Sequence, residues 1–255
     1  MKTKWAGREV VFFEETGSTN EEAKVLAEKG LPHGTLVVAD SQTLGKGRRG
    51  RSWHTPKGTS IAMSLILKPQ LNPEYASMLT LLQAMAVAKA IEEVCELKAQ
   101  IKWPNDVLVN EKKVCGILTE MHLEKTEISS IIIGTGINVN QESFPEEISH
   151  IATSLKIEKN VPQSREALLE RVCELFEVYF DRFIETKDLS GILEEYNTHL
   201  ISKGRIVKVL DPKGEFEGEA LGINSLGELL VKKETLEVMN IYAGEVSVRG
   251  IYGYV

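Results

Sequence analysis

The hexapeptide Ile101-Lys-Trp-Pro-Asn-Asp106 lies between an expected short strand and an expected hairpin. Pro104 cannot donate a backbone hydrogen bond to a sheet, and it biases Trp103 toward an extended conformation. We therefore expect Lys102 to be held at a fixed angle near the end of a strand. A simpler interpretation places Lys102 in solvent, Trp103 in the core and the last two residues in a turn. For a single hexapeptide, this simpler arrangement is the more frequent one.

Strand and helix patterns alternate on both sides of this hexapeptide. The expected strands are Val10 to Phe13, Leu36 to Ala39, Ser60 to Leu67, a short one around Ile101, a hairpin over 107–118 that turns at Asn110 to Lys112, and Ile128 to Gly134. The first expected helix begins at Ser18 or Thr19 and ends near Gly30. Three further helices are expected over 76–97, 164–185 and 189–200. The third helix carries an aromatic stripe at Phe176, Tyr179, Phe180 and Phe183, which we interpret as core. These patterns predict an α+β fold with a mixed sheet flanked by helices.

The pattern changes near residue 200. From Gly204 to Val248, short strands alternate with turns at Asp211-Pro-Lys-Gly and Asn224-Ser-Leu-Gly. We therefore expect a larger domain over 1–200 and a small β domain over 204–255.

Composition excludes several classes of protein. The net charge of -7 argues against a general nucleic-acid binder, which would carry a basic excess. No apolar run reaches membrane-spanning length, and the first residues do not resemble a secretory signal. The three cysteines, Cys95, Cys115 and Cys173, have neither disulfide-framework nor zinc-site spacing, so we expect a cytoplasmic protein.

One local segment is strongly basic in this acidic chain. The long polar loop from Asp40 to Gly58 contains Gln42-Thr-Leu-Gly-Lys-Gly-Arg-Arg-Gly-Arg51. Glycines let a ligand approach the backbone, and guanidinium groups match phosphate oxygens, so the segment suits a phosphoanion or an acyl phosphate. A solvated basic loop is an equally good interpretation of the composition alone.

Five segments together resemble, in order and spacing, the signature segments of biotin protein ligases. They are Thr16-Gly-Ser-Thr-Asn20, Gln42 with Gly45-Lys-Gly-Arg-Arg-Gly50, Lys102-Trp-Pro-Asn-Asp106, Val114-Cys-Gly-Ile-Leu118 and Gly134-Thr-Gly-Ile-Asn138. The end of the chain, Gly244-Glu-Val-Ser-Val-Arg249, resembles the close of that family's C-terminal module. The resemblance implies a class II synthetase-like catalytic domain and a small SH3-like β-barrel. Only fifteen residues precede Thr16, so we expect neither the family's DNA-binding domain nor repressor activity.

The resemblance implies that biotin and ATP, with Mg²⁺, form biotinyl-5'-AMP, and that biotin then passes to a lysine of a biotin carboxyl carrier protein. It implies no tightly bound prosthetic group, no DNA or membrane partner, and a homodimer formed through sheet edges. Expected catalytic residues are Lys102, Arg48 and Asp106. Expected biotin-binding residues are Ser18, Thr19, Asn20, Gln42, Gly45, Lys46, Gly47, Arg48, Lys102 and Gly116. Expected nucleotide-binding residues are Lys46, Arg48, Arg51, Trp53, Asn105, Asn138 and Arg249.

Some assignments have structural alternatives. Ser18 and Thr19 suit helix capping as well as ligand binding, and Asn138 suits an ordinary turn. The lysine at position 46 replaces an arginine of the best-known family members, which removes a planar fork and puts any bidentate contact there in doubt. Two rival functions are a lipoate or octanoate ligase of the same fold, and an RNA-binding module that uses Arg48 to Arg51.

Overall fold

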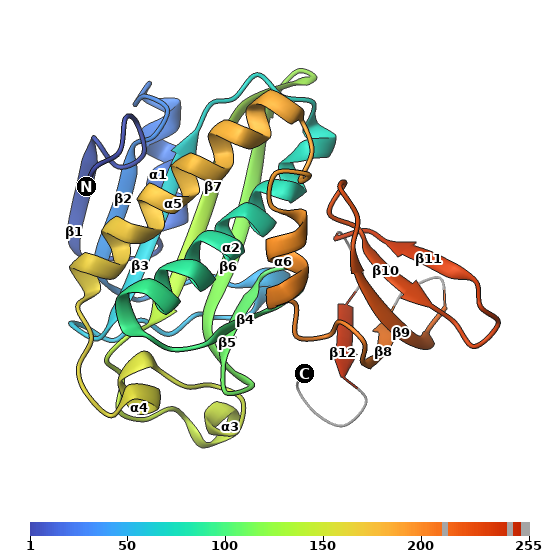
Figure 1. The fold of residues 1–255 in the computed structure, drawn as a ribbon. Helices are drawn as coiled ribbons and strands as arrows, with labels where there is room; N and C mark the ends of the chain where they lie inside the picture. The colour runs from blue at the N-terminus through green and yellow to red at the C-terminus, as the bar shows by residue number, and fades with distance from the viewer. Residues whose placement is uncertain (211–213, 244–246, 251–255) are drawn as a thin grey trace.

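A mixed seven-stranded sheet forms the centre of the larger domain (Figure 1). The computed structural model describes residues 1–210, 214–243 and 247–250. The strands are β1 (Val10–Thr16), β2 (Leu36–Gln42), β3 (Ser60–Leu67), β4 (Ala99–Lys102), β5 (Asp106–Val109), β6 (Lys112–Glu124) and β7 (Glu127–Asn138). Their order is β1-β2-β3-β7-β6-β5-β4, in which β1 and β2 are parallel and every other pair is antiparallel. The mixed sheet predicted from the sequence is confirmed.

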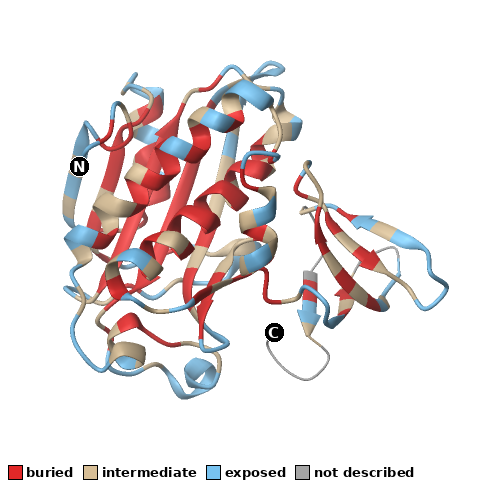
Figure 2. Cartoon of the chain, viewed as in Figure 1, coloured by how far each residue is buried: buried red, intermediate tan, exposed pale blue. Residues whose placement is uncertain are grey.

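Helices cover both faces of this sheet. They are α1 (Thr19–Glu28), α2 (Ala76–Cys95), α3 (Glu146–Ser149), α4 (Leu155–Lys159), α5 (Arg165–Thr186) and α6 (Leu193–His199), with 3₁₀ turns η1 (Arg48–Gly50) and η2 (Pro73–Tyr75). The long helices α2 and α5 lie side by side on one face, and α1 lies on the other (Figure 1). Because α5 and the sheet enclose α2, most of its residues are buried (Figure 2).

The aromatic stripe of α5 belongs to the core, as predicted. Phe176, Tyr179, Phe180 and Phe183 are all buried, and the Ser164 hydroxyl accepts a hydrogen bond from the Ala167 amide at the helix start. A helix-capping bond of this kind contributes about 1 kcal/mol.

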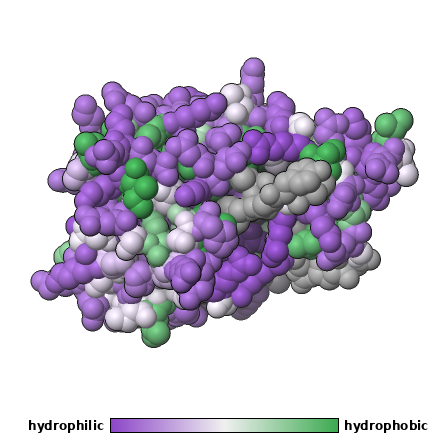
Figure 3. All heavy atoms as spheres, turned by 90° about the horizontal axis from the view of Figure 1, so that it is seen from below, coloured by the Kyte–Doolittle hydropathy of each residue, from purple (hydrophilic) through white to green (hydrophobic). Residues whose placement is uncertain are grey.

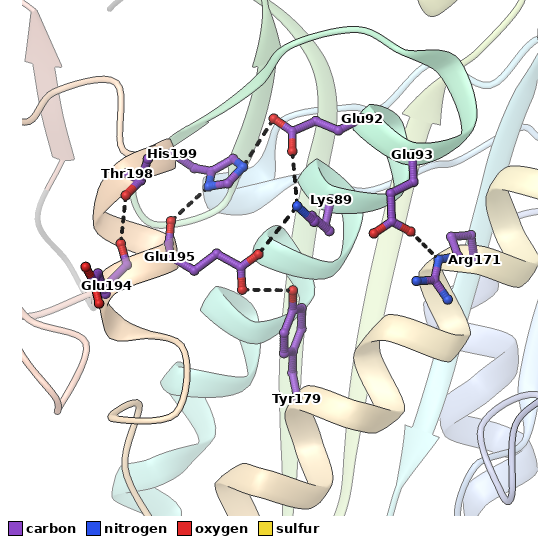
Figure 4. A network of polar contacts seen from close by, with 9 residues as sticks. All are labelled: Lys89, Glu92, Glu93, Arg171, Tyr179, Glu194, Glu195, Thr198 and His199. Atoms are coloured by element: carbon purple, nitrogen blue, oxygen red, sulfur yellow. Dashed lines mark hydrogen bonds and ion pairs between the residues drawn. The ribbon is translucent and has the colours of Figure 1, made fainter.

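Helix α6 is held against α2 and α5 by a network of polar side chains (Figure 4). His199 Nε2 lies 3.2 Å from a carboxylate oxygen of Glu92 on α2. From α5, the Tyr179 hydroxyl donates to Glu195 at 3.3 Å. Lys89 lies 3.7 Å from Glu92 and 3.8 Å from Glu195, between the two acids. The network fixes the end of α6, and with it the segment that leads to the small domain.

The segment after α6 covers the outer edge of β4. The Ile201 amide donates to the Ile101 carbonyl at 3.0 Å, one residue before Lys102. Behind the same strand, the Trp103 indole Nε1 donates to the Gly227 carbonyl of the small domain at 3.0 Å. Lys102 therefore projects from a strand end that is held on both sides, as its place before Pro104 predicted.

The small domain is an antiparallel five-stranded sheet. Its strands are β8 (Ile206–Leu210), β9 (Phe216–Ile223), β10 (Leu229–Lys232), β11 (Val238–Ile241) and β12 (Ser247–Gly250), in the order β11-β10-β9-β8-β12. The predicted turn at Asn224 is present, since its side-chain oxygen accepts hydrogen bonds from the amides of Leu226 and Glu228. Residues 211–213 of the other predicted turn, and 244–246 and 251–255 near the chain end, lie outside the described residues.

Several local expectations differ from the structure. The helix after β1 begins where predicted, but the Ser18 side chain makes no capping bond; the side-chain oxygen of Gln42 accepts from the Thr19 amide at 2.8 Å instead. The short helices α3 and α4 have too few residues for a periodic pattern and were not predicted. Cys95, Cys115 and Cys173 are free and buried. Within the described ranges, no helix is long and apolar enough to cross a membrane.

Candidate active site

Three glycines form the floor of a small pocket in the centre of the sheet. Gly116 on β6 pairs with Gly136 on β7, and Gly134 lies two residues earlier. A Cβ atom on Gly134 would lie 2.0 Å from the Asn20 side-chain oxygen, and one on Gly136 would lie 2.2 Å from Nε1 of Trp53. Glycine is therefore required here by close packing of side chains against the backbone.

The start of α1 and the end of β2 form the polar end of this pocket. The Gln42 side-chain oxygen accepts from the amide and hydroxyl of Thr19, at 2.8 and 3.2 Å, while its side-chain nitrogen donates to Thr55. The Ser64 hydroxyl lies 2.8 Å from the Thr19 hydroxyl and 2.6 Å from Asn20 Oδ1. These contacts fix which atoms donate and which accept, so the pocket end suits a compact ligand with both kinds of group.

Trp53 occupies much of the pocket. Its indole lies against Gly116 and Gly136, and only about 50 Å³ of free space remains. In the part of the chain that the structure describes, the buried Trp53 Nε1 has no hydrogen-bond partner. An unsatisfied buried donor costs about 1–3 kcal/mol. Movement of the indole out of the pocket would let this N–H find a partner, and this gain offsets part of the free energy needed to open the site for a ligand.

A second, larger cavity of about 980 Å³ adjoins the pocket. Gly47, Arg48, Trp53, Asn105 and Lys113 line both spaces. Hydrophilic residues predominate on the face of the molecule seen from below (Figure 3). The cavity's remaining walls include Arg51, Lys102, Asp106, Asn138 and Arg249, together with apolar residues of the segment around α3.

Burial weakens the protonated state of two cations in the cavity. It lowers the pKa of the Lys102 ammonium to about 8, against the opposing charge of Asp106. It also lowers the pKa of the Arg48 guanidinium, and the neighbouring charge of Arg49 adds to this effect. Arg48 Nη1 donates to Asn105 Oδ1 at 2.8 Å, which fixes its direction. Cations that have lost hydration in this way favour an anionic ligand.

Lys113 is a site residue that the sequence interpretation missed. Its ammonium lies 2.6 Å from a carboxylate oxygen of Asp106 and 5.4 Å from the centre of the Trp53 ring. The two residues sit on neighbouring strands β5 and β6. The hairpin was predicted, and charged residues on both of its strands were the available signal. Gly134 and Gly136 were also missed as wall residues, although their segment was recognised.

The structure brings the sequence-predicted residues together, with one exception. Each predicted site residue other than Gly45 lines the pocket, the larger cavity or both. Gly45 is buried, and its carbonyl accepts from the Trp53 amide at 2.8 Å. A Cβ atom there would lie 2.3 Å from the Trp53 carbonyl oxygen. Gly45 therefore contacts the backbone of Trp53 and connects the two sides of the loop.

The remaining predicted residues have clear structural partners. Lys46 pairs with Glu21 on α1 at 2.5 Å, which holds the loop at the pocket mouth. Asn105 donates to the Ile117 carbonyl at 3.1 Å, and Asn138 to the Thr153 carbonyl at 3.1 Å. Arg249 on β12 is exposed and brings the small domain to the cavity wall.

Comparison with known proteins gives a consistent result. Residues 12–138 match the Biotin/lipoate A/B protein ligase family, and residues 204–249 match the Biotin protein ligase C terminal domain. The chain is 39% identical to the bifunctional ligase/repressor BirA of Bacillus subtilis over 249 residues, which cover 96% of this chain and 76% of that protein. It is 30% identical to the biotin--[acetyl-CoA-carboxylase] ligase of Mycobacterium tuberculosis, over 88% of this chain and 83% of the relative.

A solved structure extends the agreement to the whole fold. The biotin protein ligase from Aquifex aeolicus in complex with biotin and ATP superimposes with a TM-score of 0.83 at 33% identity, covering 95% of this chain and 99% of the other. Both parts of the molecule, the large mixed sheet with its helices and the small antiparallel sheet, are thus accounted for. Together with the sequence matches, this places the chain in the biotin protein ligase family of enzymes.

Proposed function

We propose that the chain forms biotinyl-5'-AMP from biotin and ATP, and then transfers biotin to a lysine of a biotin carboxyl carrier protein. The Aquifex relative is described with biotin and ATP, and the Mycobacterium relative is named as a ligase for acetyl-CoA carboxylase. The observation that carries the proposal is the junction of the two cavities. A ligand with a compact polar ring in the small pocket and a phosphate in the large cavity would have its connecting group beside Arg48 and Lys113.

Ring recognition depends on the polar end of the small pocket. The ureido group of biotin has two N–H donors and one carbonyl acceptor. Ser18, Thr19 and Gln42 line this pocket and carry hydroxyl and amide groups of the matching kinds, and the backbone of Gly116 lines it as well. A lipoyl or octanoyl chain would offer these polar groups no hydrogen-bonding atoms in place of the ureido group. We expect discrimination of about 10⁴ against such chains, which argues against the lipoate ligase alternative.

Repulsion between anions is the main barrier to the first step. A carboxylate and a phosphate oxyanion about 4 Å apart repel by about 4 kcal/mol at an effective dielectric constant near 20. Lys102, the last residue of β4, lies in the cavity with Arg48 and Arg51. We propose that Lys102 bridges the biotin carboxylate and the α-phosphate, and that Arg48 contacts the phosphate side. Lys46 lines the small pocket and pairs with Glu21, so its proposed phosphate contact requires movement of the loop. Approach of these anions raises the pKa of Lys102 again and keeps it protonated.

Mg²⁺ enters this proposal only as part of the MgATP substrate. Among the described residues, no group of three or more His, Cys, Asp or Glu side chains is placed to hold a metal ion. The ATP phosphates would therefore supply most of the ligands of the Mg²⁺ ion, and the ion would offset charge on the departing pyrophosphate. Trp53, Asn105, Asn138 and Arg249 remain the proposed nucleotide contacts, with Arg51.

Transfer to the acceptor needs a neutral amine. The ordinary lysine pKa is about 10.4, so a carboxylate near the mixed anhydride would assist the loss of a proton. Asp106 is the proposed group. Its carboxylate contacts Lys113 at 2.6 Å, and it therefore also positions a cation beside the phosphate.

Loop 43–59 must move before biotin enters. About 50 Å³ is room for a few water molecules only. We propose that the Trp53 indole leaves Gly136 when biotin binds, and that the loop then orders over the adenylate and excludes water from it.

The test is biotin-dependent exchange of labelled pyrophosphate into ATP. We expect exchange with biotin and none with lipoate, and we expect Lys102→Ala to reduce it by at least about a hundredfold with the fold intact. Exchange that depends on lipoate and not on biotin would refute the proposal. Transfer is checked separately, by adding a purified biotin carboxyl carrier domain and following biotin on its lysine.

The other expectations stay proposals. We propose domains over 1–200 and 204–255, a cytoplasmic location and a homodimer. The outer edge of β4 is covered by the segment after α6, whereas β1 ends the sheet on the other side and exposes Val10 and Phe12. A dimer formed through sheet edges would therefore use β1. Sedimentation of Phe12→Glu as a monomer, with the parent chain as a dimer, is the expected result.

A further inference from the structure

The loop 43–59 leaves the sheet at the end of β2 and rejoins it at the start of β3. Its middle carries the cations and the indole that line both cavities. The sequence of the loop does not show what holds its two ends in place, because the residues that bind them lie elsewhere in the chain. Arg165, the first residue of α5, is one of these and was not identified as a site residue from the sequence.

Arg165 joins the two ends of the loop through one guanidinium nitrogen. Its Nη1 donates to Asp40 Oδ1 on β2 at 2.7 Å and to the Ser60 carbonyl on β3 at 3.0 Å. The same Asp40 oxygen accepts from the Gly58 amide at 3.2 Å. Asp40 is 16% exposed and Arg165 35%. The pair is therefore partly shielded, and both strands and the loop end converge on it.

We propose that Arg165 is a positioning residue for adenylate formation, which clamps the entry and exit of loop 43–59 through Asp40 and Ser60. The inference rests on the proposed function for its kinetic consequence, though its structural consequence does not. Arg165 lies on the long helix that packs along α2, so the clamp fixes the loop ends relative to these two packed helices.

The physical reason is the geometry that the reacting anions demand. Closing a loop costs conformational entropy, and the cost rises when its ends are free to separate. Arg48, which lines both cavities, must meet developing charge in a defined place, and a displacement of about 1 Å can cost a factor of about 10² in rate. A clamp at the loop ends narrows the range that this cation samples without touching a substrate itself.

The variants are chosen to separate the clamp from general stability. Arg165→Gln and Asp40→Asn each remove one side of the pair, and the double variant removes both. Arg165→Lys keeps a donor of the same charge. Arg171→Gln is the matched control, because Arg171 lies on the same helix and pairs with Glu93 (Figure 4) and with Glu174, away from the loop. Thermal melting of every variant establishes that it is folded.

Two measurements are made on each variant. Hydrogen exchange of loop amides, including those of Gly47 and Trp53, reports loop freedom without any substrate. Pyrophosphate exchange gives kcat and KM for biotin. In Arg165→Gln and Asp40→Asn, we expect about tenfold faster amide exchange and about tenfold lower kcat, with KM for biotin within about twofold. The double variant should be no worse than either single one, because the two residues act as a unit.

The outcomes are distinct. Recovery of most of kcat by Arg165→Lys, and parental values for Arg171→Gln, complete the expected pattern. Parental amide exchange in Arg165→Gln and Asp40→Asn, or losses that add in the double variant, would overturn the clamp. If the parent chain itself showed no biotin-dependent exchange, the proposed function would fail, whereas unequal loop protection among the variants would still establish the clamp.

Discussion

Replacing Lys102 with methionine tests two effects of its charge separately, namely the stability that the folded protein loses and the contribution to adenylate formation. Methionine has nearly the length of the lysine side chain and no charge. We expect Lys102→Met to abolish adenylate formation and, without ligands, to make the folded protein more stable. The reason is that the ligand-free fold holds Lys102 in a cavity where its protonated form is disfavoured.

The structure gives the size of the effect. Burial moves the Lys102 pKa from 10.5 to about 8. At about 1.4 kcal/mol per pH unit, this displacement of about 2.5 units sets an upper limit of about 3.5 kcal/mol. Lys102 is only partly buried, so solvent screening reduces the figure, and we expect about 1–2 kcal/mol of added stability at pH 7.

The effect has a defined dependence on pH. Between about pH 8 and 10.5, the unfolded chain binds more protons at this lysine than the folded one does, so parental stability rises with pH across that window. The methionine variant lacks this contribution. Its advantage should be complete below pH 8, reduced by roughly half at pH 9.5, and absent above pH 10.5.

Urea denaturation of both proteins at pH 7 and pH 9.5 measures the difference directly. Comparing variant with parent cancels the titration of other groups. A methionine variant that is less stable than the parent at pH 7 would refute the reasoning, as would a difference that does not change with pH. Saturating biotin and ATP should reverse the ranking, because the parent binds the anions with Lys102 in addition to the other cations and so gains more binding energy.

Three further predictions concern the pocket and the domain interface. Gly134→Ala places a Cβ 2.0 Å from a buried Asn20 oxygen, so we expect at least about tenfold weaker biotin binding by calorimetry. Unchanged affinity would show that the pocket floor adjusts to the added methyl group. Trp53→Phe leaves Trp5 and Trp103, of which Trp103 also lines the large cavity, so it should remove most of the change in tryptophan fluorescence on adding biotin and ATP; an undiminished change would place the moving indole elsewhere. Asn197→Ala removes bonds to the Ile223 amide and carbonyl, so urea denaturation should show a loss of about 1–3 kcal/mol, with pyrophosphate exchange retained.

Local chemistry explains what the sequence could predict. The cations of loop 43–59 lie close together in the chain, and Pro104 comes two residues after Lys102 and marks the end of its strand, so both could be singled out without knowledge of the fold. The aromatic stripe of α5 has helical spacing and is buried as predicted. In each case the decisive information lies within a few residues.

Register and long-range contacts explain what the sequence could not predict. Lys113 pairs with Leu108, and the register between β5 and β6 shifts between Val107 and Leu108. Its contact with Asp106 therefore depends on an irregularity of the strand pairing that the local sequence does not show. Gln42 caps α1 from 23 residues away, which no helix-start pattern contains. Arg165 reaches Asp40 across 125 residues, so only the folded chain reveals the clamp.

These long-range features converge on one physical arrangement. Lys102 and Arg48 have lost hydration, and the Trp53 N–H is buried without a partner among the described residues. Each is a local cost to the ligand-free fold, and all three groups line the same cavity. Because folding has already oriented and desolvated Lys102 at the end of β4, its ammonium needs little reorganisation when negative charge develops between biotin and ATP, and Arg48 joins it once loop 43–59 has closed. The same residues that lower the stability of the fold should therefore lower the barrier to adenylate formation. A substitution that raises stability at one of them should also slow the reaction.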